Sequence, residues 1–392
     1  MDGLAYGGRA PLIWKALNIC LVSQSYPALP KFGGIAVYSQ DIARGLTARG
    51  HCVHVIATTL TSDDGEIEDA GVHVHVRRVH WLPLVGNWLP GLGESVKVAR
   101  TLRQLHRRRR FDVVEIPNWE GLGLASTFLP GIPISMRLYT SLTESVEMAG
   151  RKPTRQERFM IWAEKTSARR VLAAVTHSEA HRQCMAAAYG LEKIEVIPLA
   201  VRIPERVEAP SGSVVLSIGR KDPRKGMDTL FAAIPTVLRQ RPEARFKIVG
   251  VPPEYEGARA LLERCPAGVE VLGWVEPERL NELYNQCAIY VSPATYESFG
   301  LTFVEAMARG RPVVGCATSA IPETVRDGVD GLLVAPRDAE ALAGALVTLL
   351  SDEGLRGRMG AAGRQRAVEN YSIEIEAARI ESYYMRLIEK NR

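Results

Sequence analysis

The chain has 392 residues, of which 46% are hydrophobic and 24% are charged, and its formal net charge is +5. This balance is typical of a globular protein, and the length predicts two domains that each bury a core. The absence of an apolar run of about 18 residues excludes a membrane-spanning helix, and an aromatic content of 7% without zinc-finger spacing argues against nucleic-acid binding.

Apolar runs that end in turn residues predict buried parallel strands along the first half of the chain. Helical patterns separate most of these runs, notably at 35–48, 94–105 and 154–169. This alternation predicts right-handed β-α-β units and a parallel sheet with helices on both faces. The predicted strands are 18–23, 52–57, 72–76, 113–116, 132–136, 172–176 and 194–197.

A polar segment rich in Pro, Ser and Gly at 204–213 predicts an interdomain linker, after which the alternation restarts. We therefore expect a second doubly wound α/β domain, with ligands at the carboxyl ends of the strands and in the cleft between the domains. The predicted strands are 214–218, 246–249, 269–272, 288–292, 312–315 and 331–334, and the predicted helices are 227–239, 276–285, 299–309 and most of the chain beyond Ala339.

The segment 217–226 has the features of a diphosphate site. It leaves a predicted strand, turns through Gly219 and opens a helix after Gly226. Free N–H groups at a helix start and nearby cations attract the same anion, although a merely solvated basic loop is the alternative. The segment is neither a Walker A loop nor a G-x-G-x-x-G turn. Its cations are Arg220, Lys221, Arg224 and Lys225.

Two carboxylates, Glu297 and Glu305, follow the predicted strand 288–292. If the stretch between them were helical, their Cα atoms would lie about 12 Å apart. A retaining glycosidase needs its carboxyl groups only ~5–5.5 Å apart, so we interpret the two as acceptors of hydroxyl groups on one long ligand. Gly300, between them, allows a ligand to approach the backbone closely.

Together these motifs resemble the GT4-type retaining glycosyltransferases, whose E-x7-E signature Glu297 and Glu305 match. The resemblance covers the chain from about Ala16 onward. It implies the GT-B fold: an N-terminal Rossmann-like acceptor domain at 1–203, a donor domain at 204–371, and a C-terminal helix at 372–392 that crosses back to the first domain. The other matching motifs are Gly33-Gly34, Val196-Ile-Pro198, the Gly219–Gly226 loop and Arg311-Pro-Val-Val314.

The resemblance also implies roles for individual residues. Arg220 and Lys225 correspond to the pair that stabilises the leaving nucleoside diphosphate, and Glu297 to the partner of the donor-sugar hydroxyls. Because the two cations replace a metal and no D-x-D motif is present, we expect neither a metal nor another cofactor, only a UDP- or GDP-sugar as co-substrate. The implied donor-binding residues are Gly33, Gly34, Gly219, Trp274, Val275, Phe299, Gly300, Leu301 and Glu305.

The acceptor side departs from the family pattern. Many relatives have a histidine after the strand that corresponds to 113–116, where this chain reads 115–120 as Glu-Ile-Pro-Asn-Trp-Glu. In front-face attack the leaving phosphate takes the acceptor proton, so we assign no catalytic base. The candidate acceptor contacts, for each of which a packing role is an equal alternative, are Asn118, Glu120, Tyr139 and His177.

Two surface features have alternative interpretations. The arginines at 100, 103 and 107–110 either complement the C-terminal dipole of a helix or hold an anionic acceptor or membrane face. The apolar segment 81–93 either packs on the core or meets a membrane or an apolar acceptor tail.

The thiols and imidazoles are not arranged in any familiar motif. The cysteines lack a C-x-x-C pair, which predicts reduced thiols in the cytoplasm, with contact at the inner membrane face as an option. His73 and His75 alternate along one strand face near His51, His54 and His80. Metal binding is conceivable there, but without ligand spacing we interpret these as ordinary surface and core histidines.

The favoured hypothesis is a retaining, metal-independent transferase that moves a hexose-type sugar to a hydroxyl of a glycan, a lipid-linked or a small-molecule acceptor. The alternatives are a nucleotide-sugar epimerase, a phosphorylase on the same fold, and a non-catalytic bilobal sugar-binding protein. A phosphorylase would need a pyridoxal-lysine site, an epimerase its own acid/base carboxylates and a binding protein an export signal; we find none of these. The sequence does not indicate an oligomeric state.

Overall fold

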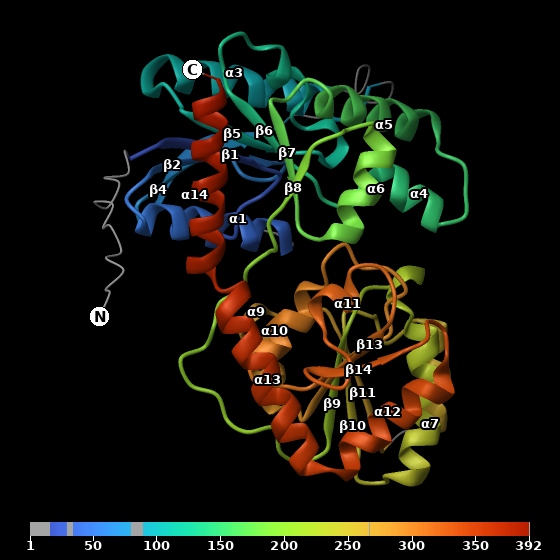
Figure 1. Cartoon of the computed structure of the whole chain (residues 1–392). Helices are drawn as coiled ribbons and strands as arrows, with labels where there is room; N and C mark the ends of the chain where they lie inside the picture. Colours follow the sequence, from blue (N-terminus) through green and yellow to red (C-terminus); the bar gives the residue numbers. More distant parts are fainter. Residues whose placement is uncertain (1–15, 30–33, 80–88, 266, 392) are drawn as a thin grey trace, which may run out of the picture.

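The computed structural model describes residues 16–29, 34–79, 89–265 and 267–391 of the chain. They form two α/β lobes, each built around one sheet (Figure 1). In the first lobe the strand order is β3-β4-β2-β1-β5-β6-β7-β8, and the neighbours are parallel except for β3 and β4. The strands are β1 (Asn18–Ser23), β2 (Cys52–Thr59), β3 (Gly65–Asp69), β4 (Val72–Arg78), β5 (Val113–Pro117), β6 (Ile134–Arg137), β7 (Ala173–Thr176) and β8 (Ile194–Val196). The α-helices are α1 (Gly34–Ala48), α3 (Leu92–Arg109), α4 (Leu142–Met148), α5 (Arg155–Ala168) and α6 (Glu179–Tyr189), and two 3-10 turns lie at Trp119–Gly121 and Leu124–Phe128.

The first sheet is buried on both faces, which explains why its central strands are almost continuously apolar. On one face, Val53 and Val55 of β2 pack in a core with α1. On the other face, Cys20 of β1 and Ile56 of β2 pack with Leu102 of α3. Helices on both sides hold the strand ends, and therefore the loops that follow them, in fixed positions.

The second lobe has a wholly parallel sheet in the order β11-β10-β9-β12-β13-β14. The strand order reverses direction at β9 and β12, where ligands of doubly wound sheets bind. The strands are β9 (Val214–Ile218), β10 (Arg245–Val249), β11 (Val269–Gly273), β12 (Ile289–Ser292), β13 (Val313–Cys316) and β14 (Gly331–Val334). The helices are a 3-10 turn (Pro223–Lys225), α7 (Met227–Gln240), α8 (Glu256–Arg264), α9 (Pro277–Gln286), α10 (Leu301–Ala308), α11 (Ile321–Thr324), α12 (Ala339–Ser351) and α13 (Glu353–Tyr371).

The last helix, α14 (Ile373–Lys390), returns to the first lobe and packs on α1, which confirms the predicted crossing (Figure 1). The Tyr384 hydroxyl donates to the Glu115 carboxylate of β5 at 2.9 Å. Two segments of chain link the lobes, one near Val201 and the other near Ser372. The Val201 amide donates to the Tyr371 carbonyl at 2.9 Å, so these two segments run side by side.

Most of the predicted elements lie within a few residues of the observed ones, with two informative differences. The predicted all-parallel first sheet carries an antiparallel edge strand, β3, whose polar sequence GEIED gave no apolar run. The helix predicted from residue 299 begins at Leu301, because Gly300 has a left-handed backbone with φ 92° and cannot belong to the helix. The ranges predicted as helices did not include α4, α6, α8 or α11.

Candidate functional site

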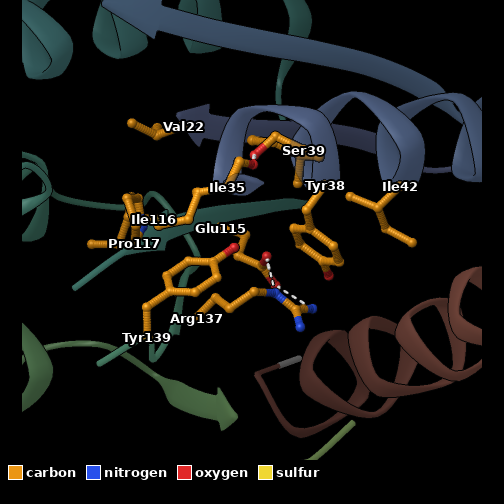
Figure 2. Close-up of a pocket in the computed structure, with 11 residues that line it drawn as sticks. Val22, Ile35, Tyr38, Ser39, Ile42, Glu115, Ile116, Pro117, Arg137 and Tyr139 are labelled. Atoms are coloured by element: carbon orange, nitrogen blue, oxygen red, sulfur yellow. Dashed lines mark hydrogen bonds and ion pairs between the residues drawn. The ribbon is translucent and has the colours of Figure 1, made fainter. Parts of the chain in front are cut away.

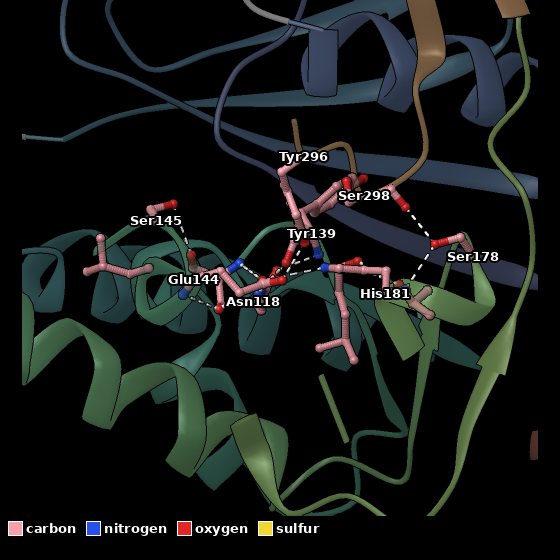
Figure 3. Close-up of polar contacts among 12 residues, drawn as sticks. Asn118, Tyr139, Glu144, Ser145, Ser178, His181, Tyr296 and Ser298 are labelled. Atoms are coloured by element: carbon pink, nitrogen blue, oxygen red, sulfur yellow. Dashed lines mark hydrogen bonds and ion pairs between the residues drawn. The ribbon is translucent and has the colours of Figure 1, made fainter. Parts of the chain in front are cut away.

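The carboxyl ends of the two sheets face each other and touch through polar contacts (Figure 3). The Tyr296 hydroxyl of the second lobe donates to the Glu144 carboxylate of α4. The Ser178 hydroxyl, at the start of α6, donates to the Ser298 carbonyl at 2.7 Å. These contacts come from the residues around Glu297, so the predicted donor segment lies at the boundary between the lobes.

A further contact fixes the same boundary. The carboxylate of Glu323, in α11, accepts the amide hydrogens of Glu179 and Ala180 at 2.7 Å each. These amides begin α6, so the second lobe supplies an anion at a positive helix end of the first lobe. The arrangement couples the position of α11 to that of α6.

The diphosphate-type loop between β9 and α7 is shaped by its glycines. Gly226 has φ 63°, and a Cβ there would lie 2.0 Å from the carbonyl oxygen of Pro293. A Cβ on Gly219 would meet Met227 at 2.1 Å. The Thr295 amide donates to the Arg224 carbonyl at 2.7 Å, which ties the loop to the segment after β12. The chain therefore brings the two predicted motifs, 217–226 and 292–305, into contact.

The four cations of this loop have different surroundings. The Arg224 guanidinium pairs with Asp222 at 2.7 Å; burial acts to raise the pKa of that carboxyl, but the hydrogen bonds from Arg224 hold it below its usual range. The Lys221 ammonium lies 4.9 Å from the centre of the Tyr255 ring. Arg220 is exposed, and its side chain makes no hydrogen bond or ion pair with another described residue. Arg220 is thus the cation of the loop that is available to an anion.

The fourth cation, Lys225, links the loop to the E-x7-E segment. Its ammonium lies 2.6 Å from Oε1 of Glu297, and the two side chains are 21% and 14% exposed. The backbone amide of Glu297 donates to the Ser319 hydroxyl at 3.0 Å, which holds the backbone at this residue in place. A half-buried lysine beside a half-buried carboxylate at the tips of β9 and β12 forms a polar site that can hold charge and hydroxyl groups.

Glu305 lies in α10, where its carboxylate accepts the Tyr284 hydroxyl at 2.7 Å. Burial raises the pKa of the Glu305 carboxyl, while the hydrogen bond from Tyr284 acts in the opposite direction. Because α10 begins at Leu301, the three residues that follow Glu297 are not helical, and the helical separation assumed for Glu297 and Glu305 does not apply. This corrects the sequence-based distance and leaves the roles of the two carboxylates as predictions.

The remaining donor-site predictions lie on segments of both lobes. Phe299 is buried, and its carbonyl accepts the Thr324 hydroxyl at 2.6 Å. Trp274, which follows β11, is 72% exposed, and its neighbour Val275 is partly buried. Gly34 begins α1, and a Cβ there would meet nothing within 4 Å, so the space beside it is open. Gly33 lies outside the described residues.

Three of the four acceptor candidates are buried in the first lobe, at the carboxyl ends of its strands. Asn118 is fully buried. Its side-chain Nδ2 donates to the Tyr139 carbonyl and to the Tyr189 hydroxyl, and its Oδ1 accepts the backbone amide hydrogen of Tyr139, all at 2.8–2.9 Å. The ring of Tyr139 lies 5.5 Å from that of His177. Burial first, and then His181 and Arg137, lower the pKa of His177 well below its usual value. These contacts are those of side chains that brace the strand ends.

The fourth candidate, Glu120, is partly exposed and has a left-handed backbone with φ 48°. Burial raises the pKa of its carboxyl. Its amide donates to Glu164, a buried carboxyl that also accepts the Leu142 amide and the Tyr189 hydroxyl. Burial and then the charge of Glu120 raise the pKa of Glu164 to about 7, against the effect of its hydrogen bonds.

The sequence interpretation missed a buried charged cluster behind these strand ends. The Arg137 guanidinium donates to Glu115 at 2.7 Å and lies 3.7 Å from Glu376 of α14. Figure 2 shows this ion pair beside Tyr38 and Tyr139, lining a small pocket under the start of α1. The only signal in the sequence was a charged residue within or just after each of two apolar runs, 113–116 and 132–136, which did not reveal the pairing.

The basic cluster of α3 lies far from this boundary. Arg107 and Arg109 fall in the last turn of α3, and β5 begins four residues after the helix ends. The cluster is therefore at the amino ends of the strands, opposite the cleft, where its cations complement the helix dipole. Of the apolar segment 81–93, residues 81–88 lie outside the described residues, as does His80. In the described ranges no helix is both long and apolar enough to span a membrane.

Two α/β lobes whose polar loops face each other, joined by two segments of chain, define the GT-B class of glycosyltransferases. The model of the family described as "Glycosyl transferases group 1" matches residues 203–366, and that of the "Glycosyl transferase 4-like domain" matches residues 33–200. The chain belongs to the GT4 family of glycosyltransferases, and the resemblance seen in its motifs is confirmed.

Curated relatives match over nearly the whole chain. A phosphatidyl-myo-inositol mannosyltransferase of Mycobacterium leprae is 31% identical, over 90% of this chain and 92% of the relative. A D-inositol 3-phosphate glycosyltransferase of Xylanimonas cellulosilytica is 28% identical, over 96% of this chain and 97% of the relative.

Solved structures share the fold at lower identity. Sucrose-phosphate synthase from Thermosynechococcus elongatus superposes with a TM-score of 0.78 at 22% identity, covering 95% of this chain and all of the other. HepE of Anabaena in complex with UDP and glucose superposes with a TM-score of 0.71 at 20% identity, covering 94% of this chain and 99% of the HepE chain. These matches establish the fold.

Proposed function

We propose that this glycosyltransferase transfers a hexose-type sugar, with retention of anomeric configuration and without a metal ion, from a UDP- or GDP-sugar to a hydroxyl acceptor. The observation that carries the proposal is the site at the tips of β9 and β12, where Lys225 lies 2.6 Å from Glu297 and the side chain of Arg220 makes no hydrogen bond or ion pair with another described residue. A diphosphate supplies the anion that such a pair of cations attracts.

In the proposed reaction the bond between the anomeric carbon and the diphosphate breaks, and negative charge grows on the leaving phosphate. Arg220 and Lys225 stabilise that charge, because cations already held beside the leaving group need no reorganisation as the charge develops. The acceptor oxygen attacks from the same face, and the leaving phosphate takes its proton. Glu297 and Glu305 accept hydroxyl hydrogens of the sugar and the ribose.

We propose an inositol phosphate, free or in a lipid, as the acceptor class. The support is the similarity to two relatives whose names contain inositol, one a phosphatidyl-myo-inositol mannosyltransferase and the other a D-inositol 3-phosphate glycosyltransferase. The arginines of α3 are at the opposite end of the strands from the cleft, so a lipid acceptor would have to reach the cleft without them.

The donor is tested first, by calorimetric titration of the full chain with UDP, GDP and ADP and then with the matching sugars. Tight binding of one nucleotide that is lost in Arg220→Ala supports the donor site; no binding of any nucleotide, or binding unchanged in this variant, contradicts it. Transfer is then followed with inositol 3-phosphate and with phosphatidylinositol vesicles, with and without EDTA.

The outcomes also separate the alternatives. A retaining transferase releases nucleoside diphosphate and forms a product whose anomeric configuration, α or β, equals that of the donor sugar. NMR of the product measures this configuration, and an inverted configuration excludes retention. Interconversion of donor sugars without an acceptor would indicate an epimerase. Sugar release by inorganic phosphate would indicate a phosphorylase, and nucleotide-sugar binding without any turnover a binding protein. Loss of activity in EDTA that Mg²⁺ or Mn²⁺ restores would exclude metal independence.

A further inference from the structure

A thiol and two imidazoles gather on one face of the first sheet, at the amino ends of β2 and β4. Cys52 and His54 are two residues apart in β2 and so point to the same face. The strand register places His54 beside His73 of β4. The sulfur and one ring nitrogen from each histidine all lie within 4.8 Å of one another.

A chain of polar contacts orients the middle member of this group. Nδ1 of His54 lies 2.9 Å from Nε2 of His75, and Nδ1 of His75 contacts the carboxylate of Glu66. A carboxylate beside Nδ1 of His75 favours the tautomer with the hydrogen on Nδ1 and the lone pair on Nε2, and this arrangement favours a hydrogen on Nδ1 of His54. In this tautomer the lone pair of His54 is on Nε2, which lies 3.6 Å from Sγ of Cys52. Carboxylate–histidine contacts of this kind orient metal-ligating histidines.

The group is reachable from solvent. His54 is buried, whereas Cys52 and His73 are partly exposed. Both histidines line an open pocket. Glu66, Glu68 and Arg109 line the same pocket, so two acidic side chains and one basic side chain surround the histidines. An ion therefore has an entry path and a position open to water.

We propose that Cys52, His54 and His73 bind one zinc ion, with water or Glu68 as the fourth ligand. One thiolate and two imidazoles form a donor set that zinc prefers in tetrahedral sites. Zinc bonds of about 2.0–2.3 Å bring such ligand atoms to roughly 3.3–3.8 Å from one another, so the side chains must close by about an ångström. Binding releases the Cys52 proton to solvent. The bound ion links β2 to β4 at the amino ends of the strands, the end of the sheet that is opposite the cleft.

This proposal replaces the interpretation of His54 and His73 as ordinary histidines. The sequence spacing of Cys52 and His73 gave no ligand motif, because their neighbourhood depends on the parallel pairing of β2 with β4. The proposal is independent of the proposed transfer reaction, since it concerns the amino ends of the strands.

The test uses the full chain freed of metal by a chelator and titrated with Co²⁺, followed by competition with Zn²⁺. A thiolate-to-cobalt charge-transfer band that saturates at one ion per chain, and that zinc abolishes, is expected for the wild type. Cys52→Ser should lose the band and His73→Asn should weaken binding. Glu66→Gln, which leaves every ligand in place, should weaken it by roughly 10- to 100-fold through misorientation of His54.

Cys184→Ser is the matched control, because Cys184 is an exposed thiol on α6, outside the group. It should keep the band and the wild-type affinity. Zinc should also raise the melting temperature of the wild type and of Cys184→Ser, and leave that of Cys52→Ser unchanged. The absence of a charge-transfer band in the wild type, or a band that survives Cys52→Ser, would overturn the proposal.

Discussion

Replacement of Lys225 by methionine removes the charge of the proposed leaving-group site with little change in shape. A cation about 4 Å from a developing unit charge, at an effective dielectric constant of ~20, contributes about 4 kcal/mol. Removal of one preorganised donor from sites of this kind lowers kcat by roughly 10²–10³, or about 2.7–4 kcal/mol. We therefore expect Lys225→Met to lower kcat by at least about 10².

The same change should alter stability only slightly. The Lys225–Glu297 pair is 21% and 14% exposed, and partly exposed ion pairs contribute about 0–1 kcal/mol. For a lobe of this size that corresponds to a change in melting temperature below about 4 °C. A large kinetic effect with a small thermal effect would therefore separate a catalytic role from a structural one.

The assay measures release of nucleoside diphosphate at saturating donor and acceptor, beside calorimetric melting. Lys221→Met is the control, since Lys221 belongs to the same loop but lies against the Tyr255 ring, 4.9 Å from its centre. We expect this control to stay within a few-fold of the wild type. Wild-type turnover in Lys225→Met, or an equal fall in the control, would refute the assignment of Lys225.

Three other predictions concern the loop glycine, the buried acid and the contact between the lobes. Gly226→Ala should destabilise the chain more than Gly212→Ala, because both have positive φ (63° and 72°) but only the former clashes, 2.0 Å from the Pro293 oxygen; urea unfolding that ranks the two equally would contradict this. The pKa of Glu164 is raised to about 7, so the folded chain binds more protons than the unfolded chain between about pH 4.3 and 7, and this contribution to stability is lost as pH rises through that window. The free energy of unfolding of the wild type relative to Glu164→Gln should therefore fall from pH 5 to pH 8, and a difference that does not vary with pH would count against it. Glu323→Ala removes the acceptor of two α6 amides, so small-angle scattering should show a larger radius of gyration than for Glu340→Ala, a first-turn glutamate of α12; identical radii would argue that this contact does not hold the lobes together.

The sequence predicted the parts of the fold that depend on local pattern. The loop from Gly219 to Gly226 was predicted because a strand, a glycine turn and a helix start follow one another along the chain, and β9 and β14 were predicted with their observed limits. The return of the last helix came from the family resemblance, since nothing in the pattern of residues 372–392 indicates which sheet they cover.

The parts that could not be predicted depend on long-range pairing. Tyr384 and Glu115 are 269 residues apart, and their hydrogen bond follows only from the crossing of α14. Asn118 was selected as an acceptor contact because it lies in the segment where many relatives have a histidine, yet its side-chain amide is occupied by Tyr139 and Tyr189. The selection of donor-site residues stays a prediction, because their arrangement around a ligand is a property of the complex.

The crossing of α14 has a consequence for the order in which this protein is assembled. The hydroxyls of Tyr383 and Tyr384 reach Ser135 and Glu115 of the first sheet, so the first lobe takes part of its interior from residues near position 384. During synthesis those residues leave the ribosome after the entire second lobe. The half of the molecule that is translated first is therefore the half that is completed last.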